Sequence, residues 1–410
     1  MPETPPPGAE PLDPVPAPRV LLAGGGTAGH VNPLLATAAA LREPALGGRE
    51  EAGILVLGTA EGLEADLVPE AGFDMAVVPR VPMPRRPTGD LFMLPRRLSR
   101  AVGAAGEAIE AVDAQVVVGF GGYVSTPAYL AARRAGVPVV IHEQNARPGL
   151  ANRLGASWAA AVALTFASTP LRSSKGRTEV TGLPLRPAIG ELVARLAEPD
   201  GAAAARRAGA AALGLDPQAP TVLITGGSLG AQRLNEVLAA ALPSLSPDLQ
   251  VLHLTGRDKD GPVRAAVEAA VADGAAADLA ERYHVLDYLV AMEQAYACAD
   301  GVICRSGAGT VAELTALGLP ALYVPLPIGN GEQRLNAADV VAAGGGRLVA
   351  DARLTAADVV DFTALLTRPA ERGAMAAAAA STGVRDGARR LADLIRTVAR
   401  EGCPSPRRKA

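Results

Sequence analysis

The amino-terminal part of the chain holds a glycine-rich turn that could bind phosphate. Residues 19–30 read Arg-Val-Leu-Leu-Ala-Gly-Gly-Gly-Thr-Ala-Gly-His, an apolar strand followed by a turn and the start of a helix. Gly24, Gly26 and Gly29 match the spacing G-x-G-x-x-G, which by itself indicates nicotinamide or flavin binding. The free N–H groups and the dipole of a helix start suit any phosphate or pyrophosphate. A nucleotide-sugar diphosphate therefore fits this turn as well as NAD does.

The second strand gives little support to a dinucleotide. A dinucleotide site uses an acidic residue at the end of that strand to hold the ribose. The apolar run over residues 54–57 is followed by Gly58 and Thr59, and Glu61 lies only nearby. A tight strand-to-helix turn is the plain alternative, and it explains some of the glycines but not three in a row.

Two sets of polar residues could carry catalysis in this half. His30 closes the glycine turn, where a histidine could act as a base, donate a hydrogen bond or simply pack. An apolar strand over residues 139–141 is followed by His142-Glu-Gln-Asn145. Because ligands of open α/β sheets bind beyond the carboxyl ends of the strands, this run predicts a sugar or phosphate site more than an ordinary polar loop.

The second half offers two further acidic motifs. Thr310-Val-Ala-Glu313 matches a helix capping box, in which Glu313 would bond back to the Thr310 amide. The alternative is that Glu313 accepts hydrogen bonds from a ribose diol. Asp258-Lys-Asp260 is similar to the metal-binding D-x-D of other sugar transferases, but the glycines and the proline around it indicate a helix start, and we expect no metal site there.

The elements that position these residues occur twice. The strand, glycine turn and helix of residues 19–30 return at 221–231, and Val116-Val-Val-Gly-Phe-Gly-Gly122 has its counterpart in Val302-Ile-Cys-Arg-Ser-Gly-Ala-Gly309. Short β-branched runs alternate with Ala-rich helical stretches throughout, which is typical of parallel sheets wrapped by helices. We predict an α/β fold of two doubly wound Rossmann-like domains with a ligand cleft between them.

The join between the domains is expected near residues 180–187, where Gly182 and two prolines favour a defined connection. We expect a flexible proline-rich tail over residues 1–18, a first domain over 19–182 and a second over 183–385. A helix over 386–401 could pack back on the first domain, and a tail over 402–410 would follow it.

Composition excludes several classes of protein. The chain has 410 residues, 49% of them hydrophobic and 20% charged, with a net charge of -3, which disfavours disorder and a nucleic-acid partner. Three cysteines are too few and too irregular for a disulfide framework or a zinc site, so a reducing cytoplasm fits. The first 19 residues lack the basic start and apolar core of a secretory signal. No apolar stretch reaches the roughly 20 residues of a membrane span, so any membrane contact should be peripheral.

Several motifs together carry a resemblance to a known family. They stand in order over residues 24–30, 119–125, 142–145 with 149–152, 226–231, 305–313 and 331–336, and they cover most of the chain from residue 20 to about 349. In these motifs the sequence resembles family 28 of the GT-B glycosyltransferases, the bacterial cell-wall enzymes that transfer N-acetylglucosamine from UDP-N-acetylglucosamine (UDP-GlcNAc) to lipid I. Ala28 departs from the Gly of many members, and Glu332 from the Gln of some, which could change hydrogen bonding to the sugar.

The resemblance implies an inverting transfer with two substrates on two domains. The first domain would take the lipid-linked acceptor, whose C4 hydroxyl attacks the anomeric carbon of the donor, so that UDP leaves and lipid II forms. The second domain would take UDP-GlcNAc, with the Leu289 backbone on uracil, Glu313 on ribose, Gln333 on the sugar, and Arg186 and Ser228 on the nucleotide and phosphates. The implied donor contacts are Thr27, Ala28, Gly29, Asn145, Arg186, Ser228, Leu289, Ala308, Gly309, Thr310, Val311, Ala312, Glu313 and Gln333.

The catalytic base and the acceptor contacts follow from the same resemblance. His30 is the first candidate for the base and Glu143 the second, while His30, Tyr123, Asn145 and Asn152 are the acceptor candidates. No cofactor and no metal are expected. The implied partners are UDP-GlcNAc, lipid I, the anionic inner leaflet of the cytoplasmic membrane and possible other cell-wall synthesis proteins, which places the chain peripherally on the cytoplasmic face.

A basic and apolar segment is the candidate for membrane docking. Residues 79–87 and 91–100 set apolar side chains beside six arginines. A helix with its apolar side in the core and its charges in water is the plain alternative. Peripheral proteins use such segments on anionic lipid, so we expect the first domain to dock through Arg80 to Arg100.

Two other functions compete with a transferase. An NAD-dependent oxidoreductase is supported only by the first glycine motif and by the general fold, and it predicts one cofactor domain, whereas the motifs here are paired. A non-catalytic sensor of nucleotide sugars could use every donor contact, but it would leave the polar residues of the first domain without a purpose.

Overall fold

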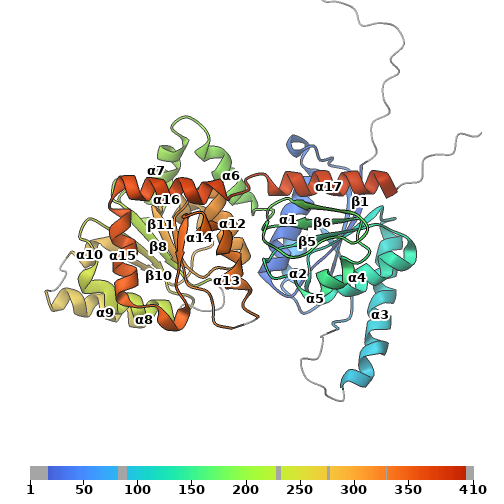
Figure 1. The fold of residues 1–410 in the computed structure, drawn as a ribbon, viewed down its shortest axis with the longest axis horizontal. Helices are drawn as coiled ribbons and strands as arrows, with labels where there is room; N and C mark the ends of the chain where they lie inside the picture. Colours follow the sequence, from blue (N-terminus) through green and yellow to red (C-terminus); the bar gives the residue numbers. More distant parts are fainter. Residues whose placement is uncertain (1–16, 82–89, 228–231, 275–277, 329, 403–410) are drawn as a thin grey trace, which may run out of the picture.

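The computed structural model describes residues 17–81, 90–227, 232–274, 278–328 and 330–402. These residues form two α/β units side by side, each a parallel sheet with helices on both faces (Figure 1). The two sheets confirm the prediction of two doubly wound domains. Strands such as Val116–Gly119 are buried along their whole length, as apolar runs are when helices cover both faces of a parallel sheet.

The first unit holds a sheet of seven strands in the order β3-β2-β1-β4-β5-β6-β7. Its strands are β1 Arg19–Ala23, β2 Gly53–Gly58, β3 Asp74–Val77, β4 Val116–Gly119, β5 Val139–Glu143, β6 Ala161–Leu164 and β7 Arg177–Val180. Its helices are α1 Ala28–Arg42, η1 Pro44–Leu46, α2 Glu64–Glu70, α3 Asp90–Ala111, α4 Gly122–Ala135 and α5 Leu150–Gly155.

The second unit holds a sheet of six strands in the order β10-β9-β8-β11-β12-β13. Its strands are β8 Thr221–Thr225, β9 Gln250–Leu254, β10 Tyr283–Leu286, β11 Gly301–Cys304, β12 Ala321–Tyr323 and β13 Gly346–Leu348. Its helices are α6 Pro187–Leu196, α7 Gly201–Leu213, α8 Gln232–Ala241, η2 Leu242–Ser244, α9 Gly261–Ala272, α10 Leu279–Arg282, α11 Met292–Cys298, α12 Ala308–Leu317, α13 Glu332–Asn336, α14 Ala338–Ala342, η3 Asp351–Arg353, α15 Ala356–Leu366 and α16 Pro369–Ser381.

The strand order reverses at the equivalent place in both sheets. The chain moves outward from β1 through β2 to β3, then returns to place β4 on the other side of β1, and β8 and β11 repeat this arrangement. Ligands of open α/β sheets bind at such a switch point, beyond the carboxyl ends of the strands. The turns after β1 and β4 therefore meet in one unit, and those after β8 and β11 meet in the other.

The last helix returns to the first unit. Helix α17, Gly387–Gly402, follows α16 of the second unit and packs against α1, β4 and β6 of the first (Figure 1). Its buried residues Leu391, Ile395 and Val398 share a core with Val20 and Leu34. The chain thus passes between the units twice, once between β7 and α6 and once between α16 and α17. The two connecting segments touch, since a Cβ at Gly182 would lie 2.4 Å from the Val384 side chain.

Helix α3 projects from the first unit at its amino-terminal end (Figure 1). Ala101, Ala105 and Ile109 are buried against the sheet, whereas Met93, Arg96 and Arg97 are exposed. Only the carboxyl-terminal part of the helix therefore fits the expectation of a core helix. In the part of the chain that the structure describes, no helix is both long and apolar enough to cross a membrane.

Candidate active site

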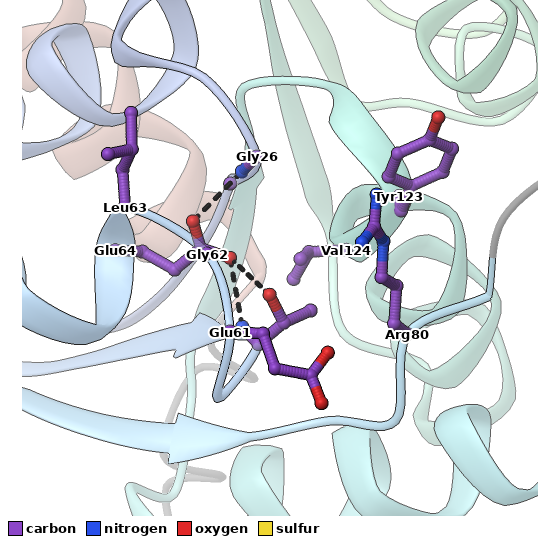
Figure 2. Close-up of a pocket in the computed structure, with 10 residues that line it drawn as sticks. Gly26, Glu61, Gly62, Leu63, Glu64, Arg80, Tyr123 and Val124 are labelled. Atoms are coloured by element: carbon purple, nitrogen blue, oxygen red, sulfur yellow. Dashed lines mark hydrogen bonds between the residues drawn. The ribbon is translucent and has the colours of Figure 1, made fainter.

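The glycine turn after β1 is held by a buried carboxylate that the sequence did not point to. Glu64, the first residue of α2, accepts hydrogen bonds from the Gly26 N–H at 2.9 Å, the Thr59 N–H at 3.0 Å and the Thr59 hydroxyl at 2.7 Å (Figure 2). Burial raises the pKa of Glu64, but these hydrogen bonds from Gly26 and Thr59 lower it, and the net pKa is below its usual value. The Glu64 carboxylate is thus bound to the protein's own glycine turn.

His30 lies on the first turn of α1 with one ring nitrogen anchored. Its Nδ1 is 3.2 Å from the Gly25 carbonyl oxygen and 3.1 Å from the Thr27 hydroxyl. Because a carbonyl oxygen can only accept, Nδ1 carries the hydrogen and Nε2 keeps its lone pair. Burial lowers the pKa of His30, against an opposing effect of the Gly25 bond and of the Glu64 charge. His30 is therefore a neutral imidazole at pH 7 with Nε2 ready to take a proton.

Two glycines of the turn after β4 make room for this imidazole. Gly121 and Gly122 have φ of 92° and 79°, a region open mainly to glycine. A Cβ at Gly121 would lie 3.2 Å from His30 Nε2, and one at Gly122 would lie 2.6 Å from the Gly25 carbonyl oxygen. The motif after β4 thus shapes the space around His30, and Tyr123 follows it with 38% of its surface exposed.

Strand β5 is longer than predicted. We expected it to end at Ile141, but it runs to Glu143, and His142 and Gln144 are buried. His142 Nε2 donates to the Gly182 carbonyl at 3.0 Å, and Gln144 Nε2 lies 3.2 Å from His142 Nδ1. Burial lowers the pKa of His142 to about 4. The predicted strand end at Ile141 is therefore wrong, and the alternative of an ordinary polar loop is excluded, because His142 and Glu143 belong to the strand and His142 joins the sheet to the interdomain connection.

Glu143 is the centre of a hydrogen-bond network. Its carboxylate accepts from the Asn145 N–H at 2.9 Å, the Gly149 N–H at 3.0 Å and Asn152 Nδ2 at 2.9 Å, and Asn152 Oδ1 accepts from Tyr129 at 2.7 Å. Burial raises the pKa of Glu143, and these hydrogen bonds only partly offset it. With three N–H groups on its oxygens, Glu143 fixes the loop over residues 145–152, and its geometry suits a base less well than that of His30.

Asn336 joins the two units beside this loop. Its Oδ1 accepts from the Ala146 N–H at 2.8 Å, while its Nδ2 donates to Asn145 Oδ1 at 3.3 Å and to the Ser306 carbonyl at 3.2 Å. Asn336 is only 1% exposed. The sequence placed it at the end of the motif over residues 331–336 but gave it no role; the buried amide brings Asn145 of the first unit to the turn after β11 of the second.

Glu313 belongs to an ion pair and not to a capping box. Helix α12 begins at Ala308 with Gly307 as N-cap, so Thr310 lies inside the helix and the capping-box interpretation is wrong. Arg186 Nε lies 2.8 Å from Glu313 Oε1 and Nη2 lies 3.1 Å from Oε2, which also accepts from Tyr296 at 3.0 Å. The structure thus brings two predicted donor residues together and adds Tyr296, which the sequence did not single out.

The other predicted donor residues lie around these two groups. The first turn of α12 over residues 308–310 is partly exposed, and residues 311–313 are buried. Gln333 Oε1 accepts from the Leu326 N–H at 3.0 Å, and Glu332 accepts from the Asn330 N–H at 3.1 Å. Leu289 packs partly buried against the core of the second unit, Thr27 and Gly29 are exposed at the start of α1, and Ser228 lies outside the described residues.

A pocket of about 260 Å³ opens beside the glycine turn, on the side of the first unit. Arg80 lies 5.4 Å from the centre of the Tyr123 ring, and both border this pocket opposite Glu61 and Glu64 (Figure 2). The pocket therefore offers one cation and one aromatic face at the predicted acceptor side.

The D-x-D motif has a structural explanation. Asp260 is the N-cap residue of α9 and lies 2.8 Å from Arg264 on the next turn. Within the described ranges, no group of three or more His, Cys, Asp or Glu side chains is arranged to hold a metal ion.

Two doubly wound domains that meet at the carboxyl ends of their strands, with His30 on one and the Arg186–Glu313 pair on the other, have the arrangement of the GT-B fold. The models of the glycosyltransferase family 28 N-terminal and C-terminal domains match residues 20–164 and 221–391. This chain belongs to glycosyltransferase family 28. The match confirms the resemblance and the fold, and it removes the support for an oxidoreductase.

Close relatives match nearly the whole chain. A protein of Bifidobacterium longum (strain DJO10A) is 51% identical over 345 residues, 82% of this chain and 86% of the relative. One from Clavibacter michiganensis subsp. michiganensis is 50% identical over 392 residues, 95% and 99% of the two chains. Both are named UDP-N-acetylglucosamine--N-acetylmuramyl-(pentapeptide) pyrophosphoryl-undecaprenol N-acetylglucosamine transferase. The crystal structure of Acinetobacter baumannii MurG, 27% identical, has a TM-score of 0.72 and covers 93% of this chain and 99% of its own.

Proposed function

We propose that this chain transfers N-acetylglucosamine from UDP-GlcNAc to the C4 hydroxyl of the muramyl sugar of lipid I, forming lipid II. The observation that carries the proposal is that the first unit holds an anchored His30 and the second holds the Arg186–Glu313 ion pair, and that Asn336 joins the strand ends of the two units. The reaction in the names of the two relatives supports the same donor and acceptor.

The donor would lie on the second unit, at the amino end of α12. The free N–H groups of that helix start and its dipole would stabilise the charge that develops on the leaving diphosphate. Arg186 would add a positive charge and Glu313 would accept from the ribose, with Gln333 on the sugar. The turns of residues 27–29 and Asn145 would close on the donor from the first unit, held there by Asn336.

The acceptor hydroxyl would be activated by His30. Nε2 would take the proton of the C4 hydroxyl while its oxygen forms a bond to the anomeric carbon, and the bond from that carbon to the UDP oxygen would break. Attack from the face opposite the leaving group inverts the configuration. A neutral imidazole is suited to this step because the free lone pair of Nε2 can accept the proton of the hydroxyl group.

One assay tests the proposal. Labelled UDP-GlcNAc and a short-chain lipid I analogue are incubated with the protein, and label should appear in the lipid product. His30→Gln should lower kcat by about 10²- to 10⁴-fold, the usual contribution of a general base, while UDP still binds. Binding of UDP without any transfer of label would favour the sensor, and full activity of His30→Gln would exclude His30 as the base.

We also propose that α3 brings the first unit to an anionic membrane. Met93, Arg96 and Arg97 lie at the exposed end of the helix, and each basic residue near an anionic surface contributes about 1 kcal/mol; Arg85 and Arg86 of the same segment lie outside the described residues. Replacing Arg96 and Arg97 by Gln should therefore weaken sedimentation with phosphatidylglycerol vesicles by about 10- to 30-fold, with transfer to a soluble acceptor nearly unchanged. Arg195→Gln with Arg207→Gln, two exposed sites on the second unit, is the matched control. Equal binding by both variants would place the docking surface elsewhere.

A further inference from the structure

A single peptide group connects a buried carboxylate to His30. The peptide between Gly25 and Gly26 accepts a hydrogen bond from His30 Nδ1 through its carbonyl, at 3.2 Å, and donates one to Glu64 Oε2 through its N–H, at 2.9 Å. Carboxylate, peptide and imidazole thus form one continuous chain of hydrogen bonds, and the carboxylate end of this chain is drawn in Figure 2.

We propose that Glu64 is a positioning residue that sets the tautomer and the basicity of His30 through this peptide. The proposal rests on His30 as the base of the proposed function. A negative charge at the N–H end of the peptide polarises it, so that the carbonyl at the other end becomes a stronger acceptor for the Nδ1 hydrogen. The imidazolium that forms during the reaction is stabilised in the same way. In serine hydrolases a carboxylate contacts the catalytic imidazole directly; here one peptide stands between them.

The site is built around the charge of Glu64. Its side chain is 0% exposed, and among the described residues its hydrogen-bond donors are the Gly26 and Thr59 N–H groups and the Thr59 hydroxyl, with no Arg or Lys. A buried charge without a cationic partner is expensive. The hydrogen bonds from Gly26 and Thr59 nevertheless hold the pKa of Glu64 below its usual value, so the side chain at the end of the Gly25–Gly26 peptide is a negative carboxylate at pH 7.

Three glycines give the carboxylate its place. A Cβ at Gly25 would lie 2.3 Å from Glu64 Oε1, one at Gly62 would lie 2.2 Å from Oε2, and one at Gly58 would lie 2.6 Å from Cγ. The turn after β1, the end of β2 and the loop before α2 thus each have a glycine where the Glu64 side chain packs. The close approach of the Glu64 side chain therefore explains why glycine stands at positions 25 and 58. A bound phosphate is not needed to explain these two glycines.

Few other charges surround His30. Glu61 and Arg80 border the pocket next to the glycine turn, and Glu143 stands behind Asn152, whose Nδ2 would lie 3.6 Å from a Cβ at Gly121. The turns of Gly25 and Gly121 that pack on the imidazole carry no ionisable side chain. The Glu64 charge acts to raise the pKa of His30 against the larger effect of burial.

The test is the Glu64→Gln substitution in the full chain, with the pKa and the tautomer of the His30 imidazole as the measured quantities. The chain has only four histidines, so ¹⁵N-histidine NMR can follow the pKa and tautomer of His30 directly. We expect the His30 pKa to fall, the Nδ1–H tautomer to lose dominance and the acid limb of the kcat–pH profile to move to lower pH. We expect activity to fall by about 10- to 100-fold, the loss typical when a metal-bound histidine loses its outer hydrogen-bond partner, and the loss should appear in kcat with little change in KM for UDP-GlcNAc.

Two further variants separate charge from shape. Glu64→Asp keeps the charge and should restore kcat and the acid limb relative to Glu64→Gln. Thr59→Val removes one donor to Glu64 and keeps the charge, so the His30 pKa should stay close to that of the parent protein. An unchanged His30 pKa and tautomer in Glu64→Gln, or a Glu64→Asp variant as impaired as Glu64→Gln, would overturn the proposal. Full activity of His30→Gln would instead refute the proposed base, a result that the NMR titration distinguishes from failure of the Glu64 link.

Discussion

Replacing Glu313 by Ala should weaken UDP binding and also destabilise the second unit. The side chain is 8% exposed and holds the 33% exposed Arg186 by two hydrogen bonds, while its Oε2 also accepts from Tyr296. A carboxylate has about four acceptor sites, so one site is left for the ribose. The substitution removes both the internal pair and that site.

The structure sets the size of the two effects. Breaking a fully buried ion pair costs about 3–5 kcal/mol, but water reaches Arg186 in part, so we expect about 2–3 kcal/mol of destabilisation. For a unit of roughly 200 residues this corresponds to a fall in Tm of about 5–10 °C. Loss of a charged hydrogen bond to ribose should raise the Kd of UDP by about 10- to 100-fold.

Calorimetry with UDP, together with thermal unfolding of the free protein, measures both effects. Asp300→Asn is the matched control, because Asp300 pairs with Arg206 at 2.8 Å just before the amino end of β11, at the sheet edge away from the donor. That variant should lower Tm and leave the Kd of UDP unchanged. If Glu313→Ala lowers Tm in the same way and binds UDP normally, Glu313 holds Arg186 in place and does not contact the ribose.

Two other properties follow from the described side chains. The free energy of unfolding should fall by about 4 kcal/mol between about pH 7.5 and about pH 5, since burial lowers the pKa of His142 to about 4 and of His253 to about 3. Each lowered histidine pKa contributes about 2 kcal/mol of stability, which is present above the unfolded pKa near 6.5 and is lost as the pH falls toward the folded pKa. Denaturant titrations at the two pH values measure this loss of stability. Equal denaturation midpoints at the two pH values would contradict the prediction. Transfer should persist in excess chelator, because Asp260 is bound to Arg264 and the donor phosphates would meet α12 and Arg186; activity that vanishes with the chelator and returns with magnesium or manganese would contradict it.

The repeated strand-turn-helix motifs were enough to predict the fold. In both halves, apolar runs of four or five residues, glycine turns and Ala-rich helices follow one another in the same order. This order predicts two similar sheets, with the switch points observed at β1 and β8. The strand end at Ile141 was predicted wrongly because polar side chains usually indicate a loop. His142 instead finds a carbonyl partner at Gly182, some 40 positions further along the chain, and such a contact has no local signal.

The candidate site could be predicted only as far as the motifs reach. His30, Glu143 and Glu313 stand in motifs, whereas Glu64 and Tyr296 are ordinary helix residues whose partners come from other elements. The capping-box spacing at Thr310 occurs by chance inside a helix, because the N-cap of α12 is Gly307, three residues before Thr310. The spacing of residues along the chain cannot distinguish a capping box from the same spacing inside a helix. For Glu64, the only indication in the sequence was the pair of nearby glycines, Gly58 and Gly62, and these are equally typical of a turn.

The return of α17 to the first unit has a consequence during synthesis on the ribosome. Leu391, Ile395 and Val398 complete the core around β1 and α1, yet they are made more than 200 residues after β6 ends at Leu164. At about 5–20 residues per second the growing chain would leave that face of the first sheet uncovered for roughly 10–50 s. The amino-terminal half is therefore the part of the nascent chain that exposes apolar surface for longest, and a stop codon just before residue 387 would release a chain in which the second unit is whole and the first is not.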